Sequence, residues 1–184
     1  MKLLIILSFL TIFNINLTTH SSVLDINPGK EIKSDNTAKK TQRLFVIERN
    51  MNKNTVCYDA VILPGGKIDI SNPIDAYWID YATTGKRSEL NYLQRHMAYG
   101  YSSEPSAAGC VYVTLKAFAK RKILLLTDAK GNVKPLIKIN TNEAQLTKIF
   151  VSAKPKSYTN VEYIELYGND IRSGKPVYEK IINQ

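Results

Sequence analysis

Short runs of apolar residues, separated by turn residues, follow one another from residue 44 to the C-terminus. They are rich in Val, Ile, Tyr, Phe and Thr, the residues that half-buried strands favour. Between them lie turn segments such as 64–66, 128–131 and 168–170, and connections this short permit hairpins rather than parallel crossovers. The pattern therefore predicts a mostly antiparallel sheet. The predicted strands are residues 44–49, 55–63, 74–81, 98–101, 111–118, 123–127, 136–140, 148–153, 161–167 and 177–182.

The alternation within these runs indicates how the sheet is enclosed. From Val111 to Ala117 alternate residues are aliphatic, whereas those from Tyr112 to Phe118 are mixed. One aliphatic face and one amphipathic face are typical of a fold with a single packed interior. Residues 123–126 (ILLL) do not alternate, so we expect that strand to be covered on both sides. The sequence predicts a mostly β protein, an antiparallel β-sandwich or barrel.

One segment has a helical period instead. Leu90, Leu93 and Met97 recur on one stripe of residues 88–97. Ser88 is a residue type that caps helix N-termini. We therefore expect one short amphipathic helix over residues 88–97.

The beginning of the chain has a different pattern again. Met1-Lys2 precede an eleven-residue apolar run at 3–13, and a cationic start before roughly 7–15 apolar residues is the layout of a secretory signal peptide. The run is shorter than the roughly 20 residues that a membrane span needs. Residues 23–42 are polar and aperiodic, which predicts a flexible linker. We expect a cleaved signal peptide at 1–22, a single β-rich domain at 43–184, no transmembrane span after cleavage, and a periplasmic or secreted location.

The expected export determines which partners the net positive charge favours. The chain has 25 Lys+Arg against 16 Asp+Glu, a formal charge of +9, and cleavage would remove only Lys2. Outside the cytoplasm nucleic acid is not an expected partner, whereas anionic lipid headgroups, polysaccharide or an acidic envelope protein are. The basic residues are scattered, however, so they could also serve solubility alone. The densest short run, Lys120–Lys122, falls where we expect a hairpin turn.

Most catalytic and cofactor motifs are missing. After signal removal His96 is the only histidine, and no nucleophile motif accompanies it, which argues against triad hydrolysis. Five residues separate Gly168 from Gly174 where a phosphate-binding P-loop has four. We therefore expect no cofactor and no metal. Cys57 and Cys110 could pair in an oxidising compartment or pack as separate thiols, and the sequence leaves both readings open.

Aromatic and charged residues are interleaved between residues 77 and 101. Rings with polar tips among charges are typical of a ligand pocket, and also of the rim of a β core. Neither face of the strand around Trp78 is uniformly apolar. Either the strand is enclosed between the core and the expected helix, or one face lines a partly wet pocket. The candidate binding residues are Tyr77, Trp78, Asp80, Tyr81, Glu89, Arg95, Tyr99 and Tyr101.

Five stretches carry a family resemblance. They are FVIERNMNKNTVCYD (45–59), PIDAYWIDY (73–81), ELNYLQRHMAYGY (89–101), YIELYG (163–168) and GKPVYEK (174–180). Together they resemble an uncharacterised bacterial family, the domain of unknown function 4833. The resemblance implies a compact, usually exported domain and supplies no activity, cofactor or catalytic residue.

Three functions remain open from the sequence. The first is an exported binding module for an amphipathic or anionic ligand or an envelope protein. The second is an envelope hydrolase that uses Asp75, Asp80 or Glu89, and the third is a purely structural envelope component. An apolar cavity would favour the first, and two carboxylates within about 10 Å in a cleft would favour the second. A closed core without a cavity would favour the third.

Overall fold

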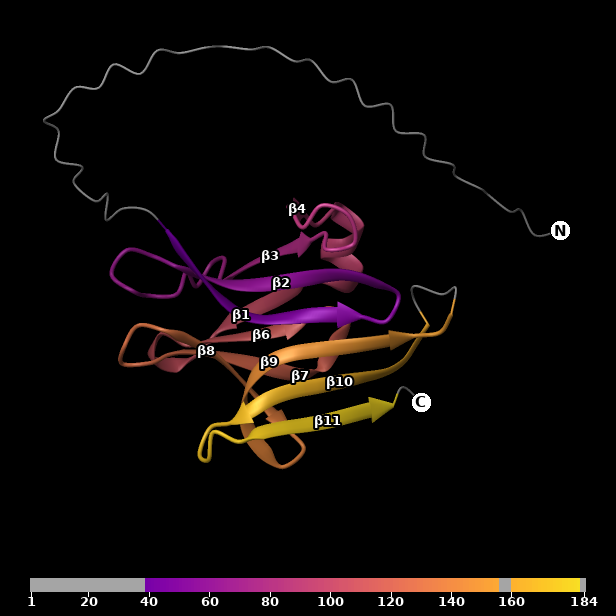
Figure 1. The fold of residues 1–184 in the computed structure, drawn as a ribbon. Coiled ribbons are helices and arrows are strands. Elements are labelled where there is room, and N and C mark those ends of the chain that lie inside the picture. The colour runs from indigo at the N-terminus through magenta and orange to yellow at the C-terminus, as the bar shows by residue number, and fades with distance from the viewer. Residues whose placement is uncertain (1–38, 156–159, 183–184) are drawn as a thin grey trace, which may run out of the picture. The chain divides into compact units, whose positions relative to one another are not determined.

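The computed structural model describes residues 39–155 and 160–182, which lie within one compact unit, residues 35–184. The unit is mostly β, as the alternation predicted (Figure 1). The expected signal peptide lies outside the described residues. The strands are β1 (Lys40–Arg49), β2 (Asn52–Ile62), β3 (Ile74–Ile79), β4 (Arg87–Glu89), β5 (Tyr101–Pro105), β6 (Val111–Leu115), β7 (Phe118–Thr127), β8 (Val133–Ile139), β9 (Asn142–Ala153), β10 (Val161–Asp170) and β11 (Pro176–Ile182).

Several boundaries differ from the predicted ones. β1 begins at Lys40, so the last three residues of the predicted linker belong to a strand. The predicted strand 98–101 is wrong except at Tyr101, where β5 begins. The expected turn at Lys120–Lys122 is also wrong, because these residues lie inside β7. The turn falls earlier, at residues 116–117.

All eleven strands belong to one sheet that branches at β9. β10 pairs with β9 from Ala144 to Ala153 and so occupies one edge of that strand. On the other edge, Asn142–Gln145 pair with β8 and Lys148–Val151 pair with β1. The β1 pairing is parallel, and the remaining pairings of the described strands are antiparallel. Two arms, β1–β4 and β5–β8, therefore leave the same edge of β9.

The hydrophobic core lies between these two arms. Its buried residues come from both, and the Tyr58 hydroxyl of β2 crosses the gap to donate to the main-chain oxygen of Tyr99 at 2.7 Å. Near the start of β1, the Gln42 side chain joins the two arms. Its Nε2 donates to the main-chain oxygen of Val133 in β8, and its Oε1 accepts from the Val133 N–H, each at 2.9 Å. The end strands β4 and β5 are not paired with each other in the described part of the chain. The sheet thus curls around one interior without closing.

Two short helical segments lie in the described residues: η2 (Ala107–Gly109) is a single 3-10 turn, and the other, within the predicted helix, begins later than the period indicated. Helical backbone runs from Tyr92 to the end of η1 (Gln94–Ala98), a π-helical turn in which the Tyr99 N–H donates to the Gln94 oxygen at 2.7 Å. Asn91, not Ser88, caps it: the Gln94 N–H donates to Asn91 Oδ1, and the Asn91 N–H donates to Gln94 Oε1, both at 2.9 Å. This reciprocal capping box fixes the start at Tyr92.

The predicted apolar stripe of that helix is wrong beyond its first member. Leu90 is buried, but Leu93 and Met97 are 63% and 73% exposed. The first residues of the predicted helix form a strand instead: Ser88 and its two neighbours are β4, which pairs with β3. The remaining turn is too short to cover the sheet with a full stripe. No helix among the described residues is long and apolar enough to cross a membrane.

Candidate functional site

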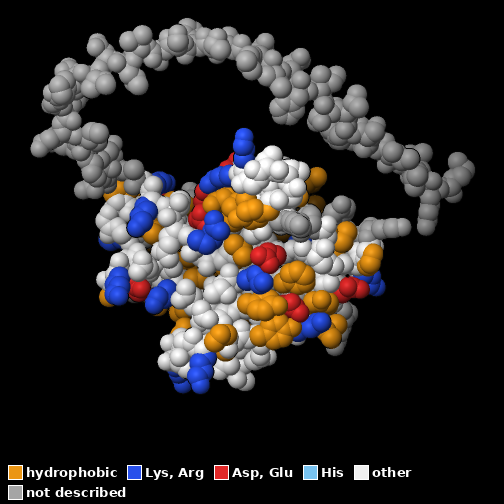
Figure 2. Space-filling view, viewed as in Figure 1, with side chains coloured by type: hydrophobic (Ala, Val, Ile, Leu, Met, Phe, Trp, Pro, Cys, Tyr) orange, Lys and Arg blue, Asp and Glu red, His pale blue; other side chains and the backbone are white. Residues whose placement is uncertain are grey.

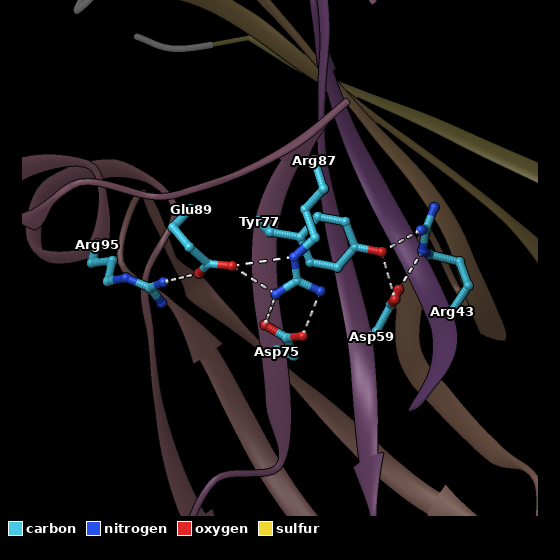
Figure 3. Close-up of polar contacts among 7 residues, drawn as sticks. All are labelled: Arg43, Asp59, Asp75, Tyr77, Arg87, Glu89 and Arg95. Carbon is cyan, nitrogen blue, oxygen red and sulfur yellow. Dashed lines mark hydrogen bonds and ion pairs between the residues drawn. The ribbon is translucent and has the colours of Figure 1, made fainter. Parts of the chain in front are cut away.

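The outer face of β2–β4 places two acids side by side. Asp59 of β2 and Asp75 of β3 are direct cross-strand partners. Like charges in that position are destabilising, so the pair needs compensation by cations. Arg43 of β1 and Arg87 of β4 supply it from either side, as Figure 3 shows.

Arg43 holds the first of these acids. Its guanidinium forms an ion pair with Asp59, and its Nη2 donates to the Tyr77 hydroxyl at 3.0 Å. That hydroxyl in turn donates to Asp59 Oδ2 at 2.8 Å. Burial, and then the hydrogen bond to Asp59, raise the pKa of Tyr77, so the phenol stays protonated and keeps donating.

Arg87 holds the second acid and extends the chain of charges (Figure 3). Its guanidinium carbon lies 3.9 Å from the centre of the Tyr77 ring, its Nη1 lies 3.0 Å from Asp75 Oδ2, and its Nη2 lies 2.7 Å from Glu89 Oε1. Glu89 also accepts from Arg95 Nη2 at 2.7 Å. The hydrogen bond from Arg87 is the main cause of a lowered pKa of Glu89. Glu89 is therefore held ionised.

The charged groups of this network pair with one another, so they offer little to a substrate. Three arginines face three carboxylates, and each carboxylate is engaged by at least one arginine. Glu89 has no proton to give as a general acid at neutral pH, since its pKa is lowered. Cys57, the cross-strand partner of Tyr77, is fully buried, and burial raises its pKa, so it is a neutral thiol and a poor nucleophile.

The eight candidate residues do not form one site. Tyr77, Glu89 and Arg95 belong to the outer network, whereas Trp78, Tyr99 and Tyr101 lie on the inner side, against the core. Trp78 meets Tyr99 edge-on with ring centres 4.9 Å apart. Adjacent strand residues point to opposite faces, which separates Tyr77 from Trp78.

The tyrosine hydroxyls of the inner group are already used. Tyr101 donates to the main-chain oxygen of Ile74 at 2.7 Å and accepts from its N–H at 3.2 Å. The Tyr99 hydroxyl accepts from Arg49 Nη1 at 3.1 Å. The hydroxyl groups of Tyr99 and Tyr101 are therefore satisfied within the protein, whereas the Trp78 indole N–H and Asp80 Oδ1 are buried without a hydrogen-bond partner among the described residues. Arginines rather than the helix cover the outer face.

The last two candidates lie in the connection after β3. The main-chain oxygen of Asp80 accepts from Gly85 at 2.6 Å, and its Oδ2 accepts the Thr83 hydroxyl, which together shape the turn. Tyr81 is 58% exposed.

The two cysteines stand apart in the structure. Cys57 lies within β2 and Cys110 just before β6. Both are free thiols, so of the two readings left open by the sequence the structure shows the unpaired one.

An aromatic surface covers the outer side of β9–β11. Figure 2 shows hydrophobic side chains gathered there with charges among them. Lys180 Nζ lies 3.5 Å from the Tyr163 ring centre, and Lys148 Nζ lies 4.6 Å from that of Tyr167. Glu165 accepts from the hydroxyl groups of Tyr167 at 2.7 Å and Tyr178 at 2.9 Å. These polar groups are engaged with one another.

The outer face of β6–β8 carries a cleft that the sequence analysis missed. Tyr112, Leu124 and Leu136 are consecutive cross-strand partners and form one apolar row on its floor. The cleft has a volume of about 460 Å³. The non-alternating run at 123–126 was the available signal: its strand is covered on one side only, and Leu126 is 37% exposed. The expectation that this strand is covered on both sides is wrong.

Charged residues line the rim of this cleft. Lys122, Lys138 and Arg172 lie around it, together with the acids Glu143 and Asp170. Asp170 accepts from the Ser173 N–H at 2.7 Å and from its hydroxyl at 2.8 Å. These bonds, the backbone bond first, lower the pKa of Asp170 and commit its carboxylate to the β10–β11 turn.

A second hollow of about 410 Å³ lies next to the cleft, beside that turn. It shares Leu136 and Asp170 with the first and adds Leu126 and Ile171. The Ile171 N–H donates to the main-chain oxygen of Glu143 at 3.0 Å, which ties the turn to the start of β9.

Comparison with known proteins gives one result. A family model described as "Domain of unknown function (DUF4833)" matches residues 45–180. No curated protein and no solved structure gave a significant match.

Proposed function

This chain belongs to the DUF4833 family, which has no assigned activity, and we propose that it is an exported binding module. It takes an amphipathic, anionic ligand in the cleft over β6–β8. The ligand class is the one that the composition and charge of the sequence favoured. The proposed site over β6–β8 is not the one that the sequence suggested, which lay between residues 77 and 101.

The row formed by Tyr112, Leu124 and Leu136 is the observation that carries this proposal. It is an apolar strip on the outward face of a sheet, with cationic side chains along its rim. A volume of about 460 Å³ lies within the range of roughly 300–1,000 Å³ that is usual for small-molecule sites. An apolar floor with a few charged groups suits a ligand that has both an apolar and an anionic part.

Export rests on the N-terminal pattern. A cationic start, an apolar run at 3–13 and a polar segment after it are the features of a secretory signal. In the envelope, amphiphiles with anionic groups are abundant partners for a chain whose formal charge of +9 falls only to +8 when Lys2 is removed.

The alternative envelope hydrolase has less support. Asp75 and Glu89 share Arg87, at 3.0 and 2.7 Å, so neither carboxylate is available to a substrate without breaking an ion pair. A purely structural component would not need an apolar cleft open to solvent.

Calorimetric titration tests the proposal. The chain without residues 1–22 is titrated with dodecanoate and dodecyl phosphate, and the same is done with Leu124→Gln. The control is Val46→Gln, which replaces a half-buried aliphatic residue on the outer side of β1. Burial of a leucine side chain is worth about 1.5–3 kcal/mol, so Leu124→Gln should weaken binding about tenfold or more. No saturable binding by the unmutated chain, or equal weakening by both variants, would overturn the proposal.

A further inference from the structure

The two ends of the cleft differ in character. Lys122 and Lys138 line the cleft on one side of the apolar row, and the register of β7 and β8 places Leu126 beside Lys134 on the other. The first side also receives Arg172 from the β10–β11 turn. The second side receives Ile171, which is 45% exposed.

The cations of the first end are incompletely matched. Lys122 forms an ion pair with Glu104, but Lys138 and Arg172 form no salt bridge within the described ranges. Asp170, in the same lining, compensates part of the charge of Arg172 without a salt bridge to it. Neighbouring lysines on adjacent strands repel each other, and an anion between them would relieve that repulsion. Glu143 pairs with Lys138 in register without a salt bridge to it, so it tempers the positive charge there.

At the second end the positive charge is matched and apolar surface is exposed. Lys134 lies 3.5 Å from Asp128 Oδ2, so its charge is matched, and the exposed apolar surface of Leu126 and Ile171 remains. The two hollows are neighbours that share Leu136 and Asp170 in their linings. A ligand spanning both would thus have its charge at one end and its apolar part at the other.

We infer, on the basis of the proposed function, that the cleft binds a single-chain amphiphile with one oxyanion headgroup in a fixed direction. The headgroup, a phosphate or a carboxylate, lies at Lys138 and Arg172 and accepts charge-assisted hydrogen bonds from them. The chain runs along Leu136 toward Leu126 and Ile171. This path crosses the apolar row at Leu136 alone, the row residue that both hollows share, which suits a ligand with one chain.

Calorimetry with matched ligands separates the two ends. The probes are dodecyl phosphate, dodecanoate, octyl phosphate, dodecyl maltoside and inorganic phosphate. In the unmutated chain we expect dodecyl phosphate to bind at least tenfold more tightly than both dodecyl maltoside and inorganic phosphate. The ratio between dodecyl phosphate and dodecanoate shows which headgroup the cleft prefers.

Variants at each end then test the direction. Lys138→Glu and Arg172→Glu should each weaken dodecyl phosphate at least tenfold and leave dodecyl maltoside within twofold. Ile171→Ser should reduce the preference for dodecyl over octyl phosphate. Lys86→Glu, an exposed lysine in the connection before β4, is the charge-matched control and should change nothing. Melting temperatures establish that each variant is folded.

The outcomes distinguish a failure of this inference from a failure of the proposed function. If no amphiphile binds, the proposed function fails. If dodecyl phosphate and dodecyl maltoside bind equally and Leu124→Gln weakens both, the cleft is the site but the headgroup assignment is overturned. If Lys138→Glu and Lys86→Glu weaken dodecyl phosphate alike, the effect is one of net charge and the assigned position is overturned.

Discussion

Replacement of Arg121 by methionine tests the contact that joins β11 to the β5–β8 arm. Arg121 Nη1 and Nη2 donate to the two carboxylate oxygens of Glu179 at 2.7 and 2.5 Å, and Nη1 also donates to the Lys138 oxygen at 2.8 Å. The Asn140 N–H donates to the same carboxylate at 2.5 Å. Arg121→Met keeps most of the apolar stem and removes the guanidinium.

The expected cost follows from the burial of the two partners. The side chain of Glu179 is 13% exposed and that of Arg121 is 29% exposed. Removing one partner of a buried pair costs about 3–5 kcal/mol, while exposed pairs are worth about 0–1 kcal/mol. Because this pair is partly exposed and Asn140 still donates to Glu179, we expect about 2–3 kcal/mol. For a chain of this size that corresponds to a fall in melting temperature of about 4–12 °C.

The pH dependence gives an independent check. The hydrogen bond from Arg121 is the main cause of a lowered pKa of Glu179. A carboxyl whose pKa is lower in the folded state contributes stability above its unfolded value, about 4.3, and loses it as the pH falls through the folded value. The difference between the original chain and Arg121→Met should therefore be largest near neutral pH and shrink below about pH 4.

Urea unfolding at several pH values measures the loss of unfolding free energy in Arg121→Met. The control is Lys120→Met, because Lys120 is exposed and forms no salt bridge with the described residues. Adding Glu179→Gln to Arg121→Met should recover part of the loss, since no buried carboxylate is then left unpaired. A cost no larger than that of Lys120→Met, or a cost independent of pH, would refute the reasoning.

Three further predictions concern other parts of the chain. Gly168→Ala would place a Cβ 2.6 Å from the main-chain oxygen of Gln145 and should cost about 1–3 kcal/mol; unchanged urea stability would contradict this. Asn91→Ala removes the helix cap, worth about 1 kcal/mol, so the Gln94 amide should exchange faster with deuterium. Equal protection of that amide in both chains would count against the cap. The intact mass of envelope-derived protein should place its N-terminus near residues 19–23, and a chain that keeps residue 1 would disprove cleavage.

The strands were predictable because alternation is a local property of the sequence. The run at 161–167 alternates, and it lies within β10. The partner of a residue is not local: Lys120–Lys122 resemble a turn, yet Glu179, which binds Arg121, lies 58 positions away. The parallel pairing of β1 with β9 has no signature in either segment, since register there depends on packing of the whole interior.

The candidate residues show the same limit. The interleaving of Tyr77 and Trp78 with charges was visible, but period-2 geometry divides them between the outer network and the core side. The helical stripe failed because Leu93 and Met97 had the spacing of a buried face without a surface to bury it. The Asn91–Gln94 capping box, in contrast, was present in the sequence as an N-x-x-Q pattern and went unrecognised.

The branching of the sheet at β9 determines the order in which the domain can assemble. Hairpins within β1–β3 and within β5–β8 join neighbouring segments, but the arms meet along an edge formed by residues 142–153. There the Asn50 side chain bonds the main chain of Ala153, 103 positions away, at 2.9 and 3.0 Å. Loop closure over such separations is slow, so the common interior forms late. A chain that emerges N-terminus first, from a ribosome or a translocon, must therefore hold two half-finished arms with exposed apolar faces until its last quarter arrives.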